Sequence, residues 1–258
     1  MELIKVTRDG RGVAVLTLAR PEKHNALSAQ MMTELEAAAQ ALARDDDVRV
    51  VVLAAEGRSF CAGGDLAWMR EQFGMDAATR KAESRRIATA LAALAALPQP
   101  LIGKVQGNAL GGGVGLVSVC DVAIGTEAVK MGFTETRLGL IPANIGPYAI
   151  ARMGATRARE VFMSGRVFDA AEAMRLNLLA KVVAPEALDA AVEAEIAPYL
   201  SCAPFAVRDA KALLNALAGQ VSEADLDFAI EALATRWETD EAREGIGAFL
   251  DKRKAPWG

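Results

Sequence analysis

Two glycine-rich segments and one glutamate are the residues of this sequence whose types and spacing suit chemistry. The segments are Cys61–Asp65 (CAGGD) and Gly111–Gly113 (GGG). Each follows a predicted strand and opens a predicted helix, so its backbone N–H groups lack intrahelical partners and have the positive end of a helix dipole behind them. Because glycine lets another atom approach the backbone closely, two such turns can together stabilise one developing negative charge, as an oxyanion hole does.

Glu135 follows the second turn, within the mostly apolar segment Met131–Pro142 (MGFTETRLGLIP). A carboxylate against apolar walls has a raised pKa and can exchange protons near neutral pH. Two alternatives stay open at this point. The glycines can serve only the conformation of their turns, and Glu135 can be a surface residue that pairs with Arg137.

Other kinds of site have weaker support. Neither turn matches GxGxxG or GxxxxGK[ST], and no GxSxG elbow is present, which disfavours a nucleotide-phosphate site and a hydrolase nucleophile. His24, the one histidine, follows Pro21 closely and is interpreted as a loop residue. Cys61 has no basic neighbour that would activate it, so it is interpreted as a small packing residue.

Composition excludes several classes of protein. The 258 residues are 52% hydrophobic and 24% charged, with a net charge of -4. This balance disfavours an electrostatic nucleic-acid binder, and no apolar run reaches the ~20 residues of a membrane span. The three cysteines are too scattered for a disulfide framework or a zinc site, and the N-terminus has no signal-peptide pattern. We therefore expect a cytoplasmic protein without metal, membrane or nucleic-acid partners.

The elements that must position these residues alternate between strands and helices. Strands are predicted over 12–18 and 48–55, the second apolar enough for burial on both faces. Ser28 is predicted to cap a helix that buries Met31, Leu35, Ala38 and Leu42. Further expectations are a helix over 85–97, a strand after it, two short strands within 121–133, and a mostly helical region from Asp169 onward. This order indicates an α/β fold.

Taken together, several segments resemble the crotonase, or enoyl-CoA hydratase/isomerase, superfamily. They are Arg20–Leu27, Ser59–Leu66, Val105–Leu116, Met131–Pro142 and Glu244–Trp257. The resemblance implies a spiral of ββα units over residues 1–195 and a helical C-terminal trimerisation region over 196–258. It also implies homotrimers or dimers of trimers, an acyl-CoA thioester as substrate, and no cofactor besides the CoA that the substrate carries.

The resemblance also implies roles for individual residues. The N–H groups of Gly64 and Gly112 match the oxyanion hole for the thioester carbonyl, and Glu135 matches an acid/base. The remaining positions match contacts to the substrate: Ala62 to the adenine of CoA, Asp65 and Leu66 to the sides of the acyl channel, and Lys23, Phe249 and Lys252 to the neighbourhood of the CoA moiety.

One departure from the family pattern concerns Gly115. Well-known hydratases of the family have a second glutamate in a GGGxEL motif, where this chain has Gly115 in GGGVGL. Glu135 alone must then take a proton from water and return it to the α-carbon. The leading hypothesis is an enoyl-CoA hydratase. A Δ3,Δ2-enoyl-CoA isomerase on the same residues, a non-catalytic acyl-CoA binder and other family chemistry such as thioester hydrolysis are the alternatives.

The pattern around Gly115 also resembles a bacterial subgroup that hydrates branched, carboxylated enoyl-CoA thioesters of the methylglutaconyl and isohexenylglutaconyl type. On this interpretation, Gly115 opens space in the substrate pocket for a β-branch or a second carboxylate. Arg137 and Asn144 are candidates to bind such a carboxylate, and the sequence does not choose between them.

Overall fold

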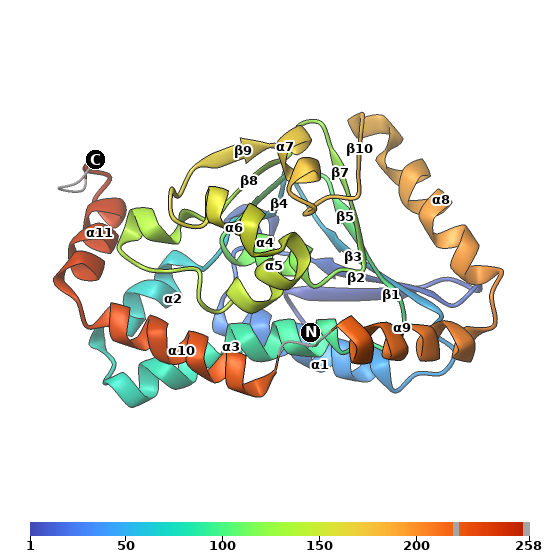
Figure 1. Ribbon diagram of the computed structural model, residues 1–258, viewed down its shortest axis with the longest axis horizontal. Helices are drawn as coiled ribbons and strands as arrows, with labels where there is room; N and C mark the ends of the chain where they lie inside the picture. The colour runs from blue at the N-terminus through green and yellow to red at the C-terminus, as the bar shows by residue number, and fades with distance from the viewer. Residues whose placement is uncertain (219–221, 255–258) are drawn as a thin grey trace.

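A six-stranded sheet forms the centre of the fold in the computed structural model, which describes residues 1–218 and 222–254 (Figure 1). Its order is β1-β2-β3-β5-β7-β10. β1 is antiparallel to β2, and the other neighbouring strands are parallel. The strands are β1 (Ile4–Arg8), β2 (Val13–Leu18), β3 (Val50–Ala55), β5 (Leu101–Val105), β7 (Val122–Thr126) and β10 (Lys181–Val183).

A second, four-stranded sheet has the order β4-β6-β8-β9. Its strands are β4 (Ser59–Cys61), β6 (Asn108–Leu110), β8 (Lys130–Gly132) and β9 (Val167–Asp169). Three times, a strand of the large sheet is followed by a strand of the small sheet and then by helix: β3-β4-α2 (Leu66–Glu71), β5-β6-α4 (Gly112–Ser118) and β7-β8-η3 (Thr134–Leu138). The expected spiral of ββα units is thereby confirmed.

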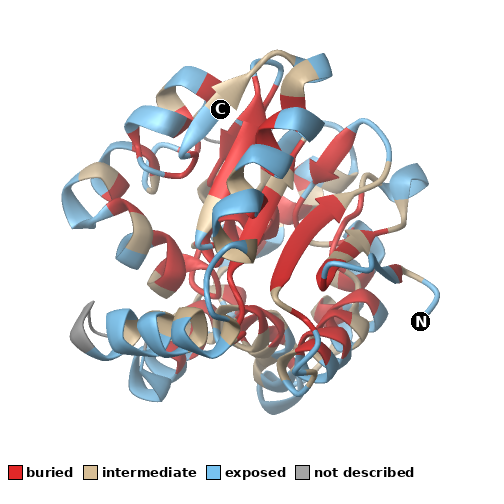
Figure 2. Ribbon diagram, turned by 90° about the vertical axis from the view of Figure 1, so that its right-hand side faces the viewer, coloured by how far each residue is buried: buried red, intermediate tan, exposed pale blue. Residues whose placement is uncertain are grey.

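Burial of β3 on both faces follows from its position between two apolar layers. Val51 and Leu53 belong to the main core, while Val50 and Val52 pack in a separate cluster with α8 (Leu188–Leu200). Figure 2 shows the buried strands in the middle of the molecule and exposed helical faces around them. The continuous apolar run of β3 therefore has the physical cause that the sequence predicted.

Helix caps explain where the predicted helices start. α1 (Ala29–Ala43) begins after Ser28, whose side chain accepts a hydrogen bond from the Met31 N–H, as expected. α3 (Ala77–Ala95) begins earlier than the predicted residue 85, because Asp76 caps it by accepting from the Thr79 N–H. The sequence also missed β9 and β10, since three-residue strands are too short to show a period of two.

The C-terminal part of the chain is helical. After α5 (Gly146–Met153), α6 (Ala155–Val161) and α7 (Ala170–Arg175) come α8, α9 (Pro204–Ala218), α10 (Glu223–Trp237) and α11 (Asp240–Leu250). α8 runs across the predicted division after residue 195, and that division stays a prediction. The last part of the family-like segment Glu244–Trp257, from residue 255 on, lies outside the described residues. Within the described ranges, every helix is too short or too polar to cross a membrane.

Helix α10 lies along α3 (Figure 1) and is joined to it by a row of ion pairs. Three basic residues of α3 face acidic residues at or near α10: Arg80 pairs with Glu238, Lys81 with Glu231, and Arg85 with both Glu223 and Asp227. Most of these pairs are exposed, so each contributes at most about 1 kcal/mol and weakens with salt. Together they set the position of α10, which reaches the cavity described below.

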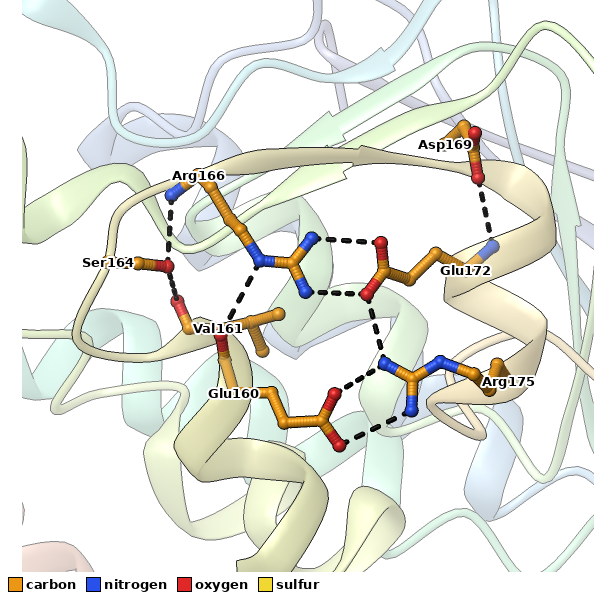
Figure 3. A network of polar contacts seen from close by, with 7 residues as sticks. All are labelled: Glu160, Val161, Ser164, Arg166, Asp169, Glu172 and Arg175. Carbon is orange, nitrogen blue, oxygen red and sulfur yellow. Dashed lines mark hydrogen bonds and ion pairs between the residues drawn. The ribbon is translucent and has the colours of Figure 1, made fainter.

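A second polar network fixes the segment between α6 and α7 (Figure 3). Glu172 accepts hydrogen bonds from Arg166 and Arg175, and Arg175 also pairs with Glu160. These two arginines lower the pKa of Glu172 to about 2. The network encloses the turn at Gly165, which packs against η3: a methyl group built there would lie 2.9 Å from Thr136 Oγ1.

Candidate active site

The two glycine turns meet because they follow adjacent parallel strands of the small sheet. β4 pairs with β6, so the turns after their carboxyl ends lie at the same edge. A methyl group built on Gly63 would lie 3.7 Å from the Gly112 nitrogen, and one built on Gly112 would lie 3.9 Å from the Gly63 Cα. Turns that are far apart in the sequence thus form one surface.

Two backbone donors of this surface have no partner in the described chain. Gly112 is the first residue of α4, and neither its N–H nor that of Gly64 donates a backbone hydrogen bond within the described ranges. Gly111, with φ 48° and ψ −117°, holds a conformation that favours glycine. The glycines therefore serve the turn conformation and also leave two N–H groups unpaired.

Glu135 brings a carboxylate to the same place. It lies in η3, directly after β8, which pairs with β6. A methyl group built on Gly111 would lie 3.1 Å from Glu135 Oε1. Glu135 Oε2 is buried and has no hydrogen-bond partner among the described residues. The alternative of a surface pair with Arg137 is wrong, since the Arg137 side chain packs beside Gly165 instead.

Burial determines the charge state of this carboxylate. Loss of solvent raises the pKa of Glu135 from the usual 4.5 to about 7, and the hydrogen bond from its own backbone N–H opposes that shift only partly. A carboxyl group with this pKa exists in both protonation states near neutral pH, as a general acid/base requires.

The turns and Glu135 line one cavity of about 430 Å³. Its walls are mostly apolar, with Leu110, Leu140, Ile141 and Ile145 among them. Polar side chains also contribute, namely Gln72, Ser84, Thr134, Arg137 and Asn144. Such a pocket, with few polar groups in an apolar wall, is typical of a small-molecule site.

The C-terminal helices α10 and α11 form part of the wall of this cavity. Leu233 and Trp237 of α10 and Phe249 of α11 belong to its lining. The Trp237 ring packs edge-on against Phe73, with ring centroids 5.6 Å apart, and the Arg80 guanidinium lies 5.8 Å from the Trp237 ring. Arg80 also donates to the Gln72 and Met75 carbonyls. Arg80 thereby ties α3, the turn after α2 and the end of α10 together at the cavity wall.

The structure brings most of the expected site residues together. The cavity lining includes Ala62, Gly64, Leu66, Gly112, Glu135 and Phe249. Lys23, Asp65, Gly115 and Lys252 are not part of the lining. The sequence missed Gln72, Ser84 and Trp237, because each lies far from the glycine motifs along the chain and none has a distinctive local pattern.

Gly115 does not open the space that the sequence led us to expect. A methyl group there would lie only 2.5 Å from Ile145 Cγ2 and 3.2 Å from Leu91 Cδ1. Ile145 is 3% exposed and itself lines the cavity. The expectation of Gly115 as a pocket residue is therefore corrected, because an isoleucine side chain from another segment fills the space beside it.

Asp65 stabilises the start of α2 and the segment around Arg20. Its side chain accepts from the Ala67 and Trp68 N–H groups, capping α2, and pairs with Arg20 at 2.7 Å. Lys23 is exposed on the segment that runs beside the first glycine turn, where the His24 carbonyl accepts from the Ala62 N–H. Lys252 follows α11, and its N–H donates to the Phe249 carbonyl.

The remaining candidate groups lie in packing or loop positions. Cys61 is buried, and burial raises the pKa of its thiol to about 12. His24 closes the short helix η1 (Pro21–Lys23), with Nδ1 3.0 Å from Ser59 Oγ. Within residues 1–218 and 222–254, no three His, Cys, Asp or Glu side chains gather as a metal site would require.

A carboxylate with a raised pKa in the same cavity as two unpaired N–H donors suits reactions that form an enolate from a thioester. The spiral of ββα units is the fold of the crotonase superfamily of enzymes, which the structure shares with solved enoyl-CoA hydratases. More narrowly, the chain belongs to the enoyl-CoA hydratase/isomerase family, whose sequence model matches residues 8–258.

Individual relatives agree with this assignment. The crotonyl-CoA hydratase of Syntrophomonas wolfei is 34% identical over 247 residues, covering 94% of this chain and 93% of the relative. A crystal structure of an enoyl-CoA hydratase from Mycobacterium avium matches with a TM-score of 0.89 and 31% identity, covering 100% of both chains. Pseudomonas aeruginosa AtuE matches with a TM-score of 0.82 and 37% identity, covering 99% of both.

Replacing Glu135 by glutamine is expected to stabilise the fold at alkaline pH. Because the folded-state pKa of about 7 lies above the usual 4.5, burial favours the protonated carboxyl, and stability falls as pH rises through 7. At about pH 8, Glu135→Gln should raise the free energy of unfolding by about 1–3 kcal/mol. Urea denaturation of both proteins between about pH 5 and 8 measures this.

The exposed Glu127 gives a matched control, because Glu127→Gln changes the same atoms outside the cavity. The gain from Glu135→Gln should shrink towards about pH 4.5. A gain that is equal at all pH values, or equal for Glu127→Gln, contradicts the assigned pKa.

Proposed function

We propose that this chain is an enoyl-CoA hydratase that adds water across the 2,3 double bond of an acyl-CoA thioester. The observation that carries the proposal is the placement of the Glu135 carboxylate: its Oε2 is buried without a hydrogen-bond partner among the described residues, and its Oε1 lies against the second glycine turn. The turn supplies donors and the glutamate supplies proton transfer. CoA arrives as part of the substrate, so the proposed reaction needs no separate cofactor.

In the proposed mechanism, the thioester carbonyl accepts hydrogen bonds from the Gly64 and Gly112 N–H groups. Ionised Glu135 takes one proton from water, and the water oxygen bonds to C3. The electron pair of the double bond moves to C2 and the carbonyl, giving an enolate held by the two donors. Protonated Glu135 then returns its proton to C2. Losing one such donor costs about 3–4 kcal/mol of barrier in other enzymes.

The same residues support the proposed substrate contacts. Ala62 and Phe249 line the cavity, whereas Lys23 and Lys252 lie outside its lining. Because all four match CoA-binding positions of the family, we propose that they contact the CoA moiety. For the acyl chain we propose a branched or carboxylated group of the methylglutaconyl kind. Arg137, an exposed cation in the cavity lining, is the side chain that suits a second carboxylate.

The reaction is tested by incubating the enzyme with straight 2-enoyl-, straight 3-enoyl- and 3-methylglutaconyl-CoA and measuring product masses. We expect a gain of one water on at least one 2,3-unsaturated thioester. Glu135→Gln should lower that rate by about 10²–10⁴-fold, because amide cannot transfer the proton. Glu127→Gln is the matched control and should retain the wild-type rate.

Two other outcomes would replace the proposal. A shifted double bond at unchanged mass would make the enzyme an isomerase on the same residues. Binding of every thioester without conversion would leave a non-catalytic acyl-CoA binder. Preference for 3-methylglutaconyl-CoA that disappears in Arg137→Met would support the carboxylated chain, whereas equal hydration rates on the straight 2-enoyl and 3-methylglutaconyl thioesters would remove it.

The pH dependence separates one catalytic carboxylate from two. With Glu135 alone, the ionised form starts the reaction in both directions, taking the proton from water or from C2. Since its pKa is about 7, kcat/KM should rise tenfold per pH unit below about 7 and level off above it, for hydration and dehydration alike. A bell-shaped profile in either direction would indicate a second essential group.

We also propose a homotrimer or a dimer of trimers. An apolar groove beside the active-site cavity is lined by Ile150, Met163 and Phe228, which are 42%, 72% and 77% exposed. Apolar patches of this kind are typical of protein interfaces. Sedimentation should give about three or six times the chain mass, and Phe228→Glu should lower it; a single-chain mass at all concentrations contradicts the proposal.

The cytoplasmic location stays a prediction.

A further inference from the structure

Asn144 is a second buried polar group in the catalytic cavity that the mechanism above leaves unused. It lies between η3 and α5, is 7% exposed and lines the cavity. Its Oδ1 atom is buried and accepts no hydrogen bond within the described residues. A buried acceptor without a donor costs free energy, so a position of this kind calls for a ligand or water.

Asn144 and Glu135 line the same cavity, and the residue that follows Asn144 packs against α4 one helical turn from the residue that Glu135 contacts. The Glu135 carboxylate lies against Gly111, and Ile145, the next residue after Asn144, lies against Gly115. Gly111 and Gly115 are one helical turn apart, with the Gly115 N–H donating to the Gly111 carbonyl at 3.3 Å. The two contacts are therefore separated by roughly 5–6 Å along α4.

Water addition creates a need for two acceptors. The attacking water has two O–H groups, and Glu135 accepts only the one whose proton it removes. The other O–H must also be satisfied in a mostly apolar cavity, because a buried water needs at least two polar partners. An amide oxygen accepts this hydrogen bond without adding a second negative charge beside Glu135.

We propose that Asn144 positions the attacking water by accepting its second O–H through Oδ1. The inference rests on the proposed hydration. Asn144 exchanges no proton: the proton from water moves to Glu135 and then to C2, while the retained O–H becomes the hydroxyl of the product. Asn144 is thus a positioning residue, and Glu135 remains the acid/base.

Gln72 is the other amide in the cavity with a buried acceptor that lacks a partner. It lies in η2 (Gln72–Gly74), and its carbonyl is held by Arg80 of α3. The Gln72 carbonyl is thus bonded to α3, whereas Asn144 is followed by Ile145, which packs against Gly115 of α4. Gln72→Leu therefore removes an equally buried amide from another wall and serves as the comparison variant.

The test measures hydration of whichever 2,3-unsaturated thioester of the panel above wild type hydrates fastest, and binding of saturated butanoyl-CoA, for wild type, Asn144→Leu, Asn144→Asp and Gln72→Leu. Asn144→Leu should lower kcat for hydration about 10–100-fold, since one lost hydrogen bond in a buried site corresponds to about that factor. The Kd for butanoyl-CoA should change less than about threefold, because binding a saturated chain requires no attacking water. Asn144→Asp retains an acceptor and should hydrate at least about tenfold faster than Asn144→Leu.

Several results would overturn the inference. They are a kcat of Asn144→Leu within about threefold of wild type, a Kd that weakens in parallel with kcat, an aspartate variant no faster than the leucine variant, and a larger loss in Gln72→Leu. Hydration by wild type that survives Asn144→Leu would overturn the positioning role alone. Absence of hydration in wild type would overturn the proposed function together with it.

Discussion

The pairing of β4 with β6 is the constraint on which the site depends. Parallel neighbours end at the same edge of a sheet, so this pairing brings together two glycine turns that are nearly fifty residues apart, Gly63–Gly64 and Gly111–Gly113. β8 adds Glu135 at the same edge because it pairs with β6 on the other side. Gly113, in the second turn, allows α4 to pack closely against the end of β4. A methyl group on Gly113 would lie only 2.4 Å from the Cys61 carbonyl oxygen.

The chemistry of Glu135 depends in turn on elements that are remote in sequence. Its raised pKa comes from loss of solvent, and the helices α10 and α11 supply part of the wall that excludes solvent. Arg80 fixes the end of α10 through Glu238 and contacts Trp237, while the network around Glu172 supports the turn that packs on η3. The ion pairs at the surface thus help to hold α10 at the cavity wall, although each is weak by itself.

Features that depend on neighbouring residues in the sequence were predictable, and features that depend on tertiary packing were not. Local residue types were sufficient to identify four features: the cap at Ser28, the apolar run of β3 that is buried on both faces, the glycine turns and Glu135. The three-residue strands β9 and β10 carry no usable period, and Asp76 as the start of α3 was not recognised. Ile145 beside Gly115 was not predictable, because the space left by a missing side chain is filled by tertiary packing, which no local pattern describes.

The packing of Ile145 against Gly115 bears on the proposal that one glutamate transfers both protons. A second carboxylate one helical turn from Glu135 would place two like charges in one cavity, and their repulsion would raise one of the two pKa values. In this chain, burial in a cavity whose apolar wall includes Ile145 raises the pKa of Glu135 to about 7 without a second charge. In the proposed hydration, the neutral amide of Asn144 accepts the second O–H of the water at a smaller desolvation cost than a second carboxylate would.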